Sequence, residues 1–345
     1  MNAKHSTLAP DPAGGSLVIS LDCEGKWGLA DCLTPQTNSL FSDEALIAVY
    51  RRLCKIFSDF DAPATFAFVA TFLMTPHEAA KQLDKLGYGK ERAVSIWLAA
   101  YFAQRQQGDL NGWHLPCLAD IVSESGVHEI AAHGFSHLPL NSDGVSPQMA
   151  RTEISMSKKA LARLGHEATT YIYARNEIAN VQAVGESGFL GFRSARLSRG
   201  RLSNFASEFS LMDTAEPFSG SHERERFGTV AIPAGRILNF HIGLRKLVPR
   251  FVTVRRWRSI LDDAAERGGC AHLWFHPHNL ISDPQAETVL RSILRHASNL
   301  RDSGKLRIET QASYAKERAS LSSGNSTEAV SIERLANAQQ ITVRP

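Results

Sequence analysis

SLVISLDCEG, residues 16–25, is the stretch of sequence that decides the fold. It opens as a short apolar run rich in β-branched residues, which is typical of a buried strand, and it ends in acidic residues. A second run of strand composition, ATFAFVA (64–70), follows a segment at 42–60 that starts with a serine and an acidic turn and then repeats apolar residues at helical spacing. A strand, a helix and a strand in this order predict a parallel β-α-β unit.

The same alternation continues toward the C-terminus. Strand-like runs at 127–132, 169–174, 189–195, 270–278 and 305–310 alternate with helical patterns near 146–164, 177–188, 252–268 and 284–303. Residues 198–240 are irregular apart from a strand-like run, GTVAIPA (228–234). We therefore expect an α/β fold with a parallel sheet in one domain over 15–318, between a flexible N-terminus (1–14) and a polar C-terminal tail (319–345).

The segment between the second and third strands is longer than a simple connection requires. It contains the helical pattern KERAVSIWLAAYFAQRQ (90–106). We expect a helical insertion at about 75–120 that shapes a substrate pocket.

Composition limits the classes of function. The 345 residues carry a formal net charge of +3, with 43% apolar and 21% charged residues, which gives no reason to expect a nucleic-acid partner. No apolar run is long enough to cross a bilayer, and the first residues lack the apolar core of a signal peptide, so we expect a cytoplasmic protein. The five scattered cysteines indicate reduced thiols rather than a disulfide framework.

One basic stretch, GLRKLVPRFVTVRRWR (243–258), alternates arginine and lysine with large apolar residues. Such a run more often marks a solvated helix face, but it also suits contact with phosphates or with an anionic membrane surface. The second interpretation predicts a protein that lies peripherally on the inner face of the membrane.

Polar residues gather where the predicted strands end. They are Asp22, Glu24, His133, His137, Arg175, His276 and His278. In barrels of alternating strands and helices, active sites assemble at the carboxyl edge of the strands, whereas the opposite edge mainly stabilises the fold. The shared position of these residues indicates a single site.

The stretch HEIAAHGFSH (128–137) places His133 and His137 four residues apart. On a helix they would project from one face and could bind a metal such as zinc; the alternative is two partly exposed histidines on a helix or turn. Asp22 and Glu24 lie two residues apart and face the same side of a strand, where one can ligate a metal while the other takes a proton from water. Two histidines and one carboxylate leave positions open for water and substrate, as a catalytic metal requires.

The motifs SLDCEG, HGFSH, YARN and WFHPHN, in that order, resemble the successive motifs of the polysaccharide deacetylase family, also called NodB-like or carbohydrate esterase family four. The resemblance covers roughly residues 15–310. It implies a distorted (β/α) barrel of about seven parallel strands, the NodB-like deacetylase fold, with the helical insertion after the second strand.

The resemblance also implies roles at the metal. Asp22 corresponds to the catalytic base, and Glu24, His133 and His137 correspond to the ligands of one divalent metal. We expect Zn²⁺ first, with Co²⁺, Ni²⁺, Mn²⁺ and Fe²⁺ as alternatives.

Two further motifs supply the remaining catalytic residues. Arg175 in YARN resembles the arginine that orients the base, and His276 resembles the acid that protonates the leaving amine, with His278 as the second candidate. The sequence departs from the common pattern in two places. It has D-x-E where adjacent aspartates are usual, a variant found in deformylases, cyclic-amide hydrolases and exopolysaccharide-locus deacetylases, and it has Asn176 where a proline is usual.

These features predict a metal-dependent amide hydrolase that removes an N-acetyl or N-formyl group from an amino sugar during surface polysaccharide (O-antigen or exopolysaccharide) biosynthesis, with the sugar carried on a nucleotide or a polyprenyl phosphate. Two alternatives stay open: a hydrolase of small cyclic or linear amides, as in purine degradation, and an inactive carbohydrate-binding protein. The oligomeric state is left open by the sequence.

Three tryptophans, Trp27, Trp113 and Trp274, could stack against a sugar ring. Core packing is the alternative, and we favour it for Trp274, which lies within a predicted strand.

Overall fold

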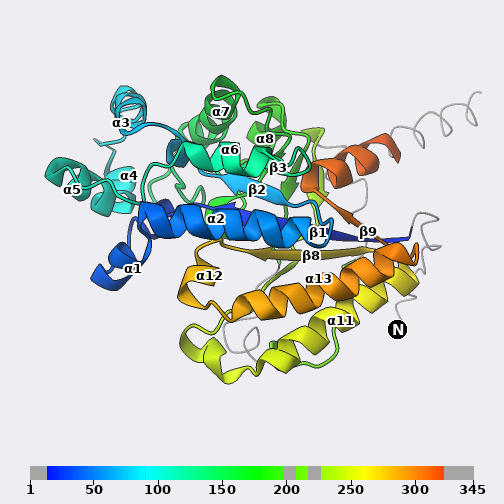
Figure 1. The fold of residues 1–345 in the computed structure, drawn as a ribbon. Coiled ribbons are helices and arrows are strands. Elements are labelled where there is room, and N and C mark those ends of the chain that lie inside the picture. Colours follow the sequence, from blue (N-terminus) through cyan, green and yellow to red (C-terminus); the bar gives the residue numbers. More distant parts are fainter. Residues whose placement is uncertain (1–13, 90, 197–206, 217–226, 322–345) are drawn as a thin grey trace, which may run out of the picture.

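The computed structural model describes residues 14–89, 91–196, 207–216 and 227–321, and these form a nine-stranded sheet wrapped by helices (Figure 1). The strands are β1 (Gly15–Cys23), β2 (Thr65–Phe68), β3 (Glu129–Ala132), β4 (Thr170–Tyr171), β5 (Gly191–Arg193), β6 (Val230–Ile232), β7 (Arg236–Ile237), β8 (Cys270–Phe275) and β9 (Leu306–Glu309). Their order is β6-β5-β4-β3-β2-β1-β8-β7, with β9 also paired to β1, and every pair of strands is parallel.

Strand β1 lies at the centre of the sheet. Its first half pairs with β9, its second half pairs with β2, and β8 runs along its other side. All nine of its residues are buried, which explains why the sequence reads as a continuous apolar run rather than an alternating one. The strand therefore carries Asp22 and Glu24 to the middle of the carboxyl edge.

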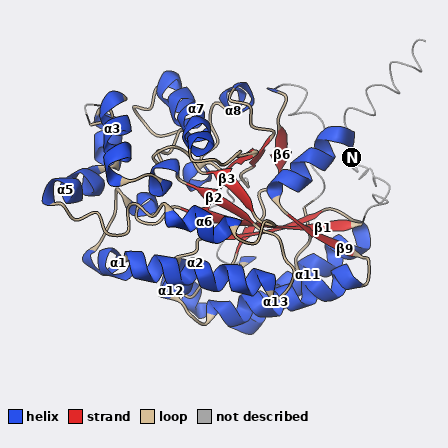
Figure 2. Cartoon of the chain, turned by 45° about the horizontal axis from the view of Figure 1, so that its top comes forward, coloured by secondary structure: helices blue, strands red, loops and turns tan. Residues whose placement is uncertain are grey.

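Helices cover the sheet on its outer side (Figure 2). The longer ones are α2 (Asp43–Ser58), α7 (Pro147–Arg163), α11 (Arg250–Arg267) and α13 (Ala286–Asp302). The shorter ones are α1 (Pro35–Leu40), α3 (Pro76–Lys85), α4 (Arg92–Trp97), α5 (Ala99–Gln107), α6 (Cys117–Ser123), α8 (Val181–Glu186) and α12 (Asn279–Ser282). Within the described residues there are also four 3-10 turns: η1 (Trp27–Leu29), η2 (Ala70–Leu73), η3 (Ala174–Asn176) and η4 (Gly243–Leu247).

Helix α2 illustrates how sequence signals place an element. The side chain of Ser42 accepts a hydrogen bond from the backbone N–H of Ala45, and two acidic residues occupy the first turn, so the N-terminus is capped and its dipole is balanced. Leu46, Val49 and Leu53 recur on one face and are buried in the hydrophobic core. The helix thus forms where its periodicity predicts it.

The prediction of a distorted (β/α) barrel is confirmed: the parallel sheet curls into a half-barrel with helices outside it. The described residues hold more strands than the seven expected, and one of the additional strands, β7, lies in a region that the sequence pattern left irregular. No helix within the described residues is long and apolar enough to traverse a lipid bilayer.

The insertion differs in detail from its prediction. The single helix expected at 90–106 is two helices, α4 and α5, because Leu98 leaves the helical conformation with φ −94° and ψ 19°. Together with α3 these helices lie at one end of the molecule (Figure 1).

The expected termini fall mostly outside the structure. Residues 1–13 and 322–345 lie outside the described residues, so the flexible N-terminus and the polar tail stay predictions. A helix over 311–321 runs past 318, where we expected the domain to end.

Candidate active site

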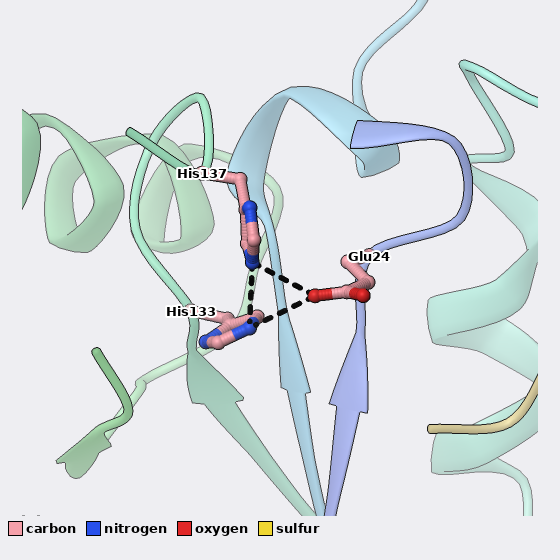
Figure 3. A group of neighbouring side chains, drawn as sticks. All are labelled: Glu24, His133 and His137. Atoms are coloured by element: carbon pink, nitrogen blue, oxygen red, sulfur yellow. Dashed lines mark hydrogen bonds and ion pairs between the residues drawn. The ribbon is translucent and has the colours of Figure 1, made fainter. Parts of the chain in front are cut away.

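Three predicted metal ligands come together at the carboxyl edge of the sheet (Figure 3). Glu24 Oε2 lies 3.3 Å from His133 Nε2 and 2.8 Å from His137 Nε2, and the two imidazole nitrogens are 3.2 Å apart. All three residues are buried. Carboxylate and imidazole atoms at this separation form the donor set of a borderline metal such as zinc.

The expectation that a helix aligns the two histidines is wrong. His133 directly follows β3, and the chain then turns through a loop in which Gly134 has φ +83° and His137 has φ +62°. Left-handed residues cannot continue a right-handed helix, so the loop itself folds back and brings the second ring over the first. The spacing identified the ligand pair, but not the backbone that carries it.

A buried carboxylate on α7 holds this loop in place. Glu153 Oε2 accepts hydrogen bonds from the backbone N–H groups of Phe135 and Ser136, each at 3.0 Å, and its Oε1 accepts one from the Ser136 hydroxyl at 2.6 Å. Burial raises the pKa of Glu153. A further bond from the Thr71 hydroxyl to the Phe135 carbonyl ties the loop to η2.

The hydrogen bonds around the three ligands fit a bound cation. His133 Nδ1 donates to the carbonyl of Ile172 at 3.0 Å, which leaves the lone pair of Nε2 directed at Glu24 and His137. One proton on His137 Nε2 can satisfy Glu24 or His133 but not both, whereas a divalent ion satisfies all three. The residues present therefore suit a mononuclear metal site.

The position of the Glu24 carboxylate depends on glycines that let the backbone pass close to it. Gly25 turns the chain with φ +52°, and a Cβ added to Gly28 would lie 2.0 Å from Glu24 Oε1. Only glycine leaves space for the carboxylate at this point. Burial would raise the pKa of Glu24, but the charges of His276 and His137 and the histidine hydrogen bonds hold it well below its usual range.

The second carboxylate, Asp22, is held by an arginine that the sequence analysis did not select. Arg193 donates from Nη1 to Asp22 Oδ1 and from Nη2 to Oδ2, both at 2.7 Å, and its side chain is fully buried. Burial would raise the pKa of Asp22, but the charge of Arg193, and then that of His133, lower it below its usual range. Asp22 is therefore a carboxylate near neutral pH, as a proton acceptor must be.

Arg175 does not orient Asp22, which corrects the prediction made for it. It donates to Asp31 at 2.7 Å, and its guanidinium lies 4.4 Å from the ring centre of Trp97, the last residue of α4. Trp97 also stacks on the ligand His137, with 5.9 Å between ring centres. The helical insertion thus packs against the site, although the structure does not test whether it shapes a substrate pocket.

Asn176 has a role that the usual proline could not perform. Its Oδ1 accepts hydrogen bonds from Arg193 Nε at 3.2 Å and Nη2 at 2.7 Å. Its φ of +56° is closed to proline, whose ring fixes φ near −65°. This departure from the common motif therefore accompanies the change of arginine.

The two histidines after β8 occupy different environments. His276 Nε2 lies 3.4 Å from Glu24 Oε1 and 4.0 Å from Asp22 Oδ2, and its Nδ1 lies 3.2 Å from Asn279 Oδ1. His278 is buried; its ring stacks on that of His276 and contacts that of Phe41 at a tilt, with ring centres 4.9 and 4.7 Å away. Burial, and then the charge of His276, lower the pKa of His278 to about 3. Only His276 faces the two carboxylates.

The three tryptophans considered as sugar-stacking residues also occupy different environments. Trp27 and Trp113 are fully buried and hydrogen-bonded through their indole N–H groups, to the Trp113 carbonyl and the Gln104 side chain respectively, so neither is placed to stack on a sugar. Trp274 is half-buried, and the Arg193 guanidinium lies 4.6 Å from its ring centre. The core reading favoured for Trp274 is only partly right.

Comparison with known proteins finds one similar family. Residues 33–195 match the sequence profile described as Polysaccharide deacetylase. This match spans 163 of the 345 residues, so the chain is similar to the polysaccharide deacetylases over nearly half of its length. No curated protein is similar enough in sequence to count as a match.

Solved structures support the fold. A protein from Mycobacterium smegmatis assigned to the polysaccharide deacetylases superposes with a TM-score of 0.56 at 16% identity, covering 92% of this chain and 96% of its own. The family 4 carbohydrate esterase from Streptomyces lividans is 10% identical with a TM-score of 0.38, covering 85% of this chain and 91% of its own. The Xyl-CE4 xylanase domain from the hindgut metagenome of Trinervitermes trinervoides is 11% identical with a TM-score of 0.40, covering 88% and 91%. At TM-scores below 0.5, the last two likenesses carry no weight.

The polysaccharide deacetylase profile does not reach every residue of the site. It begins after Asp22 and Glu24 and ends before His276, so the roles of these three residues rest on their geometry here. Arg193 falls inside the matched segment, at the end of strand β5. A charged residue inside an otherwise apolar run was the available sequence signal, and the same rule of polar strand ends would have selected it.

Proposed function

We propose that this polysaccharide deacetylase homologue is a metal-dependent amide hydrolase that removes an N-acetyl or N-formyl group from an amino sugar. The observation that carries the proposal is the convergence of Glu24, His133 and His137 within 4.8 Å of one another, beside Asp22. This arrangement offers three ligands, a separate proton acceptor and a histidine that faces both carboxylates. Zn²⁺ is the proposed ion, because it favours this mixture of nitrogen and oxygen ligands.

The chemistry that a divalent ion supplies when bound here is Lewis acidity, which lowers the pKa of water and polarises an amide carbonyl. Asp22 then accepts the proton of the attacking water, since Arg193 keeps it ionised and fixes the direction of both oxygens. His276 approaches Glu24 Oε1, whereas the two ligand histidines approach Oε2, and we propose that His276 donates a proton to the leaving nitrogen. We assign no proton transfer to His278, because its ring is stacked behind His276.

The substrate and pathway are inferred from the kind of site rather than from any bound molecule. The D-x-E pair of Asp22 and Glu24 is the variant that deformylases share with exopolysaccharide deacetylases. We therefore propose either an acetyl or a formyl group as the group removed. We propose that the sugar is an intermediate of surface polysaccharide biosynthesis, carried on a nucleotide or polyprenyl phosphate, and that the enzyme acts in the cytoplasm.

Acyl release tests this proposal. Purified protein is incubated with N-acetylated and N-formylated amino sugars and nucleotide sugars, with and without a chelator, and with cyclic imides as competing substrates. We expect acetate or formate release that the chelator abolishes and that Asp22→Asn reduces by at least about a hundredfold. Ring opening of the imides alone would instead establish the cyclic-amide reading, and a metal-loaded protein inert to every substrate would establish the binding-protein reading.

A further inference from the structure

A cavity of about 490 Å³ lies beside the residues that surround Arg193. Trp274 and Asn176 belong to its wall, and both contact Arg193, which in turn holds Asp22. The volume lies within the range of roughly 300–1,000 Å³ that small-molecule sites occupy. The cavity is therefore placed to receive a part of the substrate that does not react.

The wall of this cavity is rich in guanidinium groups. Its charged residues within the described chain are Arg175, Arg196, Arg236, Arg245 and Arg256, with Glu208 and Asp213. Arg236 and Arg256 both pair with the one carboxylate of Asp213, so a single negative charge faces two positive ones. The wall as a whole carries an excess of positive charge.

Arg196 is the arginine with the weakest partner. Its nearest carboxylate oxygen, on Glu216, is 3.9 Å away, beyond hydrogen-bonding distance, and its side chain is 44% exposed. The guanidinium therefore keeps donors for an incoming anion.

A buried amide in the same wall lacks partners. Asn239 is 6% exposed, and neither its Oδ1 nor its Nδ2 has a hydrogen-bond partner among the described residues. Buried polar groups are normally satisfied, and an amide that lines a cavity without partners indicates a ligand that supplies them. The residue follows β7, next to β8, on the same side of the sheet as Trp274.

We propose that this cavity binds a phosphate ester of the substrate, with Arg196 and the Asp213-linked arginines facing the phosphate oxygens and Asn239 bonding to the phosphate or to the adjoining sugar. The inference rests on the proposed function, because it takes the reacting amide to lie at Asp22. Guanidinium groups bind phosphate through paired N–H donors, which favours phosphate over a neutral sugar extension. A nucleotide-linked and a lipid-linked sugar share this chemistry.

Binding measured without turnover tests the inference. In an Asp22→Asn background, titration calorimetry compares N-acetylglucosamine, glucuronic acid, N-acetylglucosamine 1-phosphate, UDP-N-acetylglucosamine and prenyl-phosphate-linked N-acetylglucosamine in micelles. We expect the phosphorylated sugars to bind at least about tenfold more tightly than both others. Tighter binding of UDP-N-acetylglucosamine would identify a nucleotide as the carrier of the sugar, and tighter binding of the prenyl-phosphate-linked sugar would identify a lipid.

Substitutions locate the effect. Arg196→Gln and Asn239→Asp should each remove most of the preference for phosphate, whereas Arg51→Gln, a change at an exposed arginine on α2, should retain it. A preference that survives both changes, or equal affinity for glucuronic acid and the phosphorylated sugars, would overturn the inference. Phosphate-dependent binding without acyl release in the wild type contradicts the proposed function alone, and acyl release without phosphate preference contradicts this inference alone.

Discussion

At the scale of single residues, the site depends on contacts that chain position does not reveal. Arg175 lies in the motif that resembles the family's arginine motif, yet Arg193, at the end of another strand, makes the paired hydrogen bonds to Asp22. Sequence motifs register which residue types occur in order, but two arginines at neighbouring strand ends can exchange tasks without changing that order. Asn176 fits this exchange, since its side-chain Oδ1 accepts two hydrogen bonds from Arg193.

We predict that Arg193→Lys lowers kcat more than Arg175→Lys does. Lysine keeps the charge but cannot make two parallel bonds to Asp22, so the carboxylate loses its fixed direction. The expected loss is on the order of 10–100-fold in kcat, with metal content unchanged. Steady-state kinetics with metal analysis of both variants checks this, and a larger loss for Arg175→Lys would restore the assignment made from the motif.

We also predict that Gly28→Ala lowers metal affinity. The new methyl group would overlap Glu24 Oε1, which is 2.0 Å from the ideal Cβ position, and would displace the ligand. Gly89→Ala is the matched control, because the nearest atom to its Cβ is 4.0 Å away. Zinc titration should show weaker binding only for the first variant, and equal affinities would show that Glu24 is not a ligand.

At the scale of elements, sequence periodicity predicted the strands and helices that bury a continuous apolar face. It missed the loop conformation that individual hydrogen bonds determine. The apolar runs that became β1 and α2 were readable because each buries a continuous face. The loop at 133–137 was read as helical because it preserves the spacing of a helical turn, although Glu153 and two left-handed residues hold it open. These contacts join α7 to a loop 17 to 18 residues earlier in the chain, beyond the reach of a periodic pattern.

Glu153→Gln should loosen this loop. The amide that replaces one oxygen cannot accept the bonds from Phe135 and Ser136, and a buried donor without a partner costs about 1–3 kcal/mol. Glu129→Gln is a fitting control, because Glu129 is equally bonded to Thr65, Thr170 and Ala312 at the opposite end of β3.

Melting temperature and zinc affinity separate the two variants. Both changes should lower the melting temperature, but only Glu153→Gln should weaken zinc binding, by on the order of 10–100-fold. Unchanged zinc affinity in Glu153→Gln would show that the loop is held by other contacts.

The basic stretch at 243–258 supports a further prediction for η4 and the start of α11. Leu244, Leu247 and Phe251 are 68%, 63% and 68% exposed, and exposed cations such as Lys246 lie beside them. We propose that this surface contacts an anionic bilayer, where apolar side chains enter the interface and cations meet lipid headgroups.

Vesicle sedimentation checks this contact. Full-length protein should sediment with phosphatidylglycerol vesicles at low salt, and replacing Leu244, Leu247 and Phe251 by serine should abolish sedimentation. Ile96→Ser, at a residue 62% exposed elsewhere, should have no effect. A protein that stays in the supernatant under all conditions would leave 243–258 as a solvated surface.

At the scale of the whole molecule, the parallel sheet is what creates the site. Side chains from the ends of β1, β3, β5 and β8 meet because parallel strands present their carboxyl ends at one edge. The sequence predicts that Glu24, His133 and His137 cluster at this edge, because both the ends of the strands and the metal-binding residue types can be identified from the sequence. The cavity beside Arg193 was not predictable, because much of its wall comes from 207–213 and 234–239, where the sequence has little regular pattern.

The most direct measurement is zinc titration of the metal-free protein by calorimetry. The account predicts one Zn²⁺ bound per chain in the wild type and none at this site once both His133 and His137 are replaced by alanine, with the fold retained by circular dichroism. Equal stoichiometry and affinity in the two proteins would contradict it.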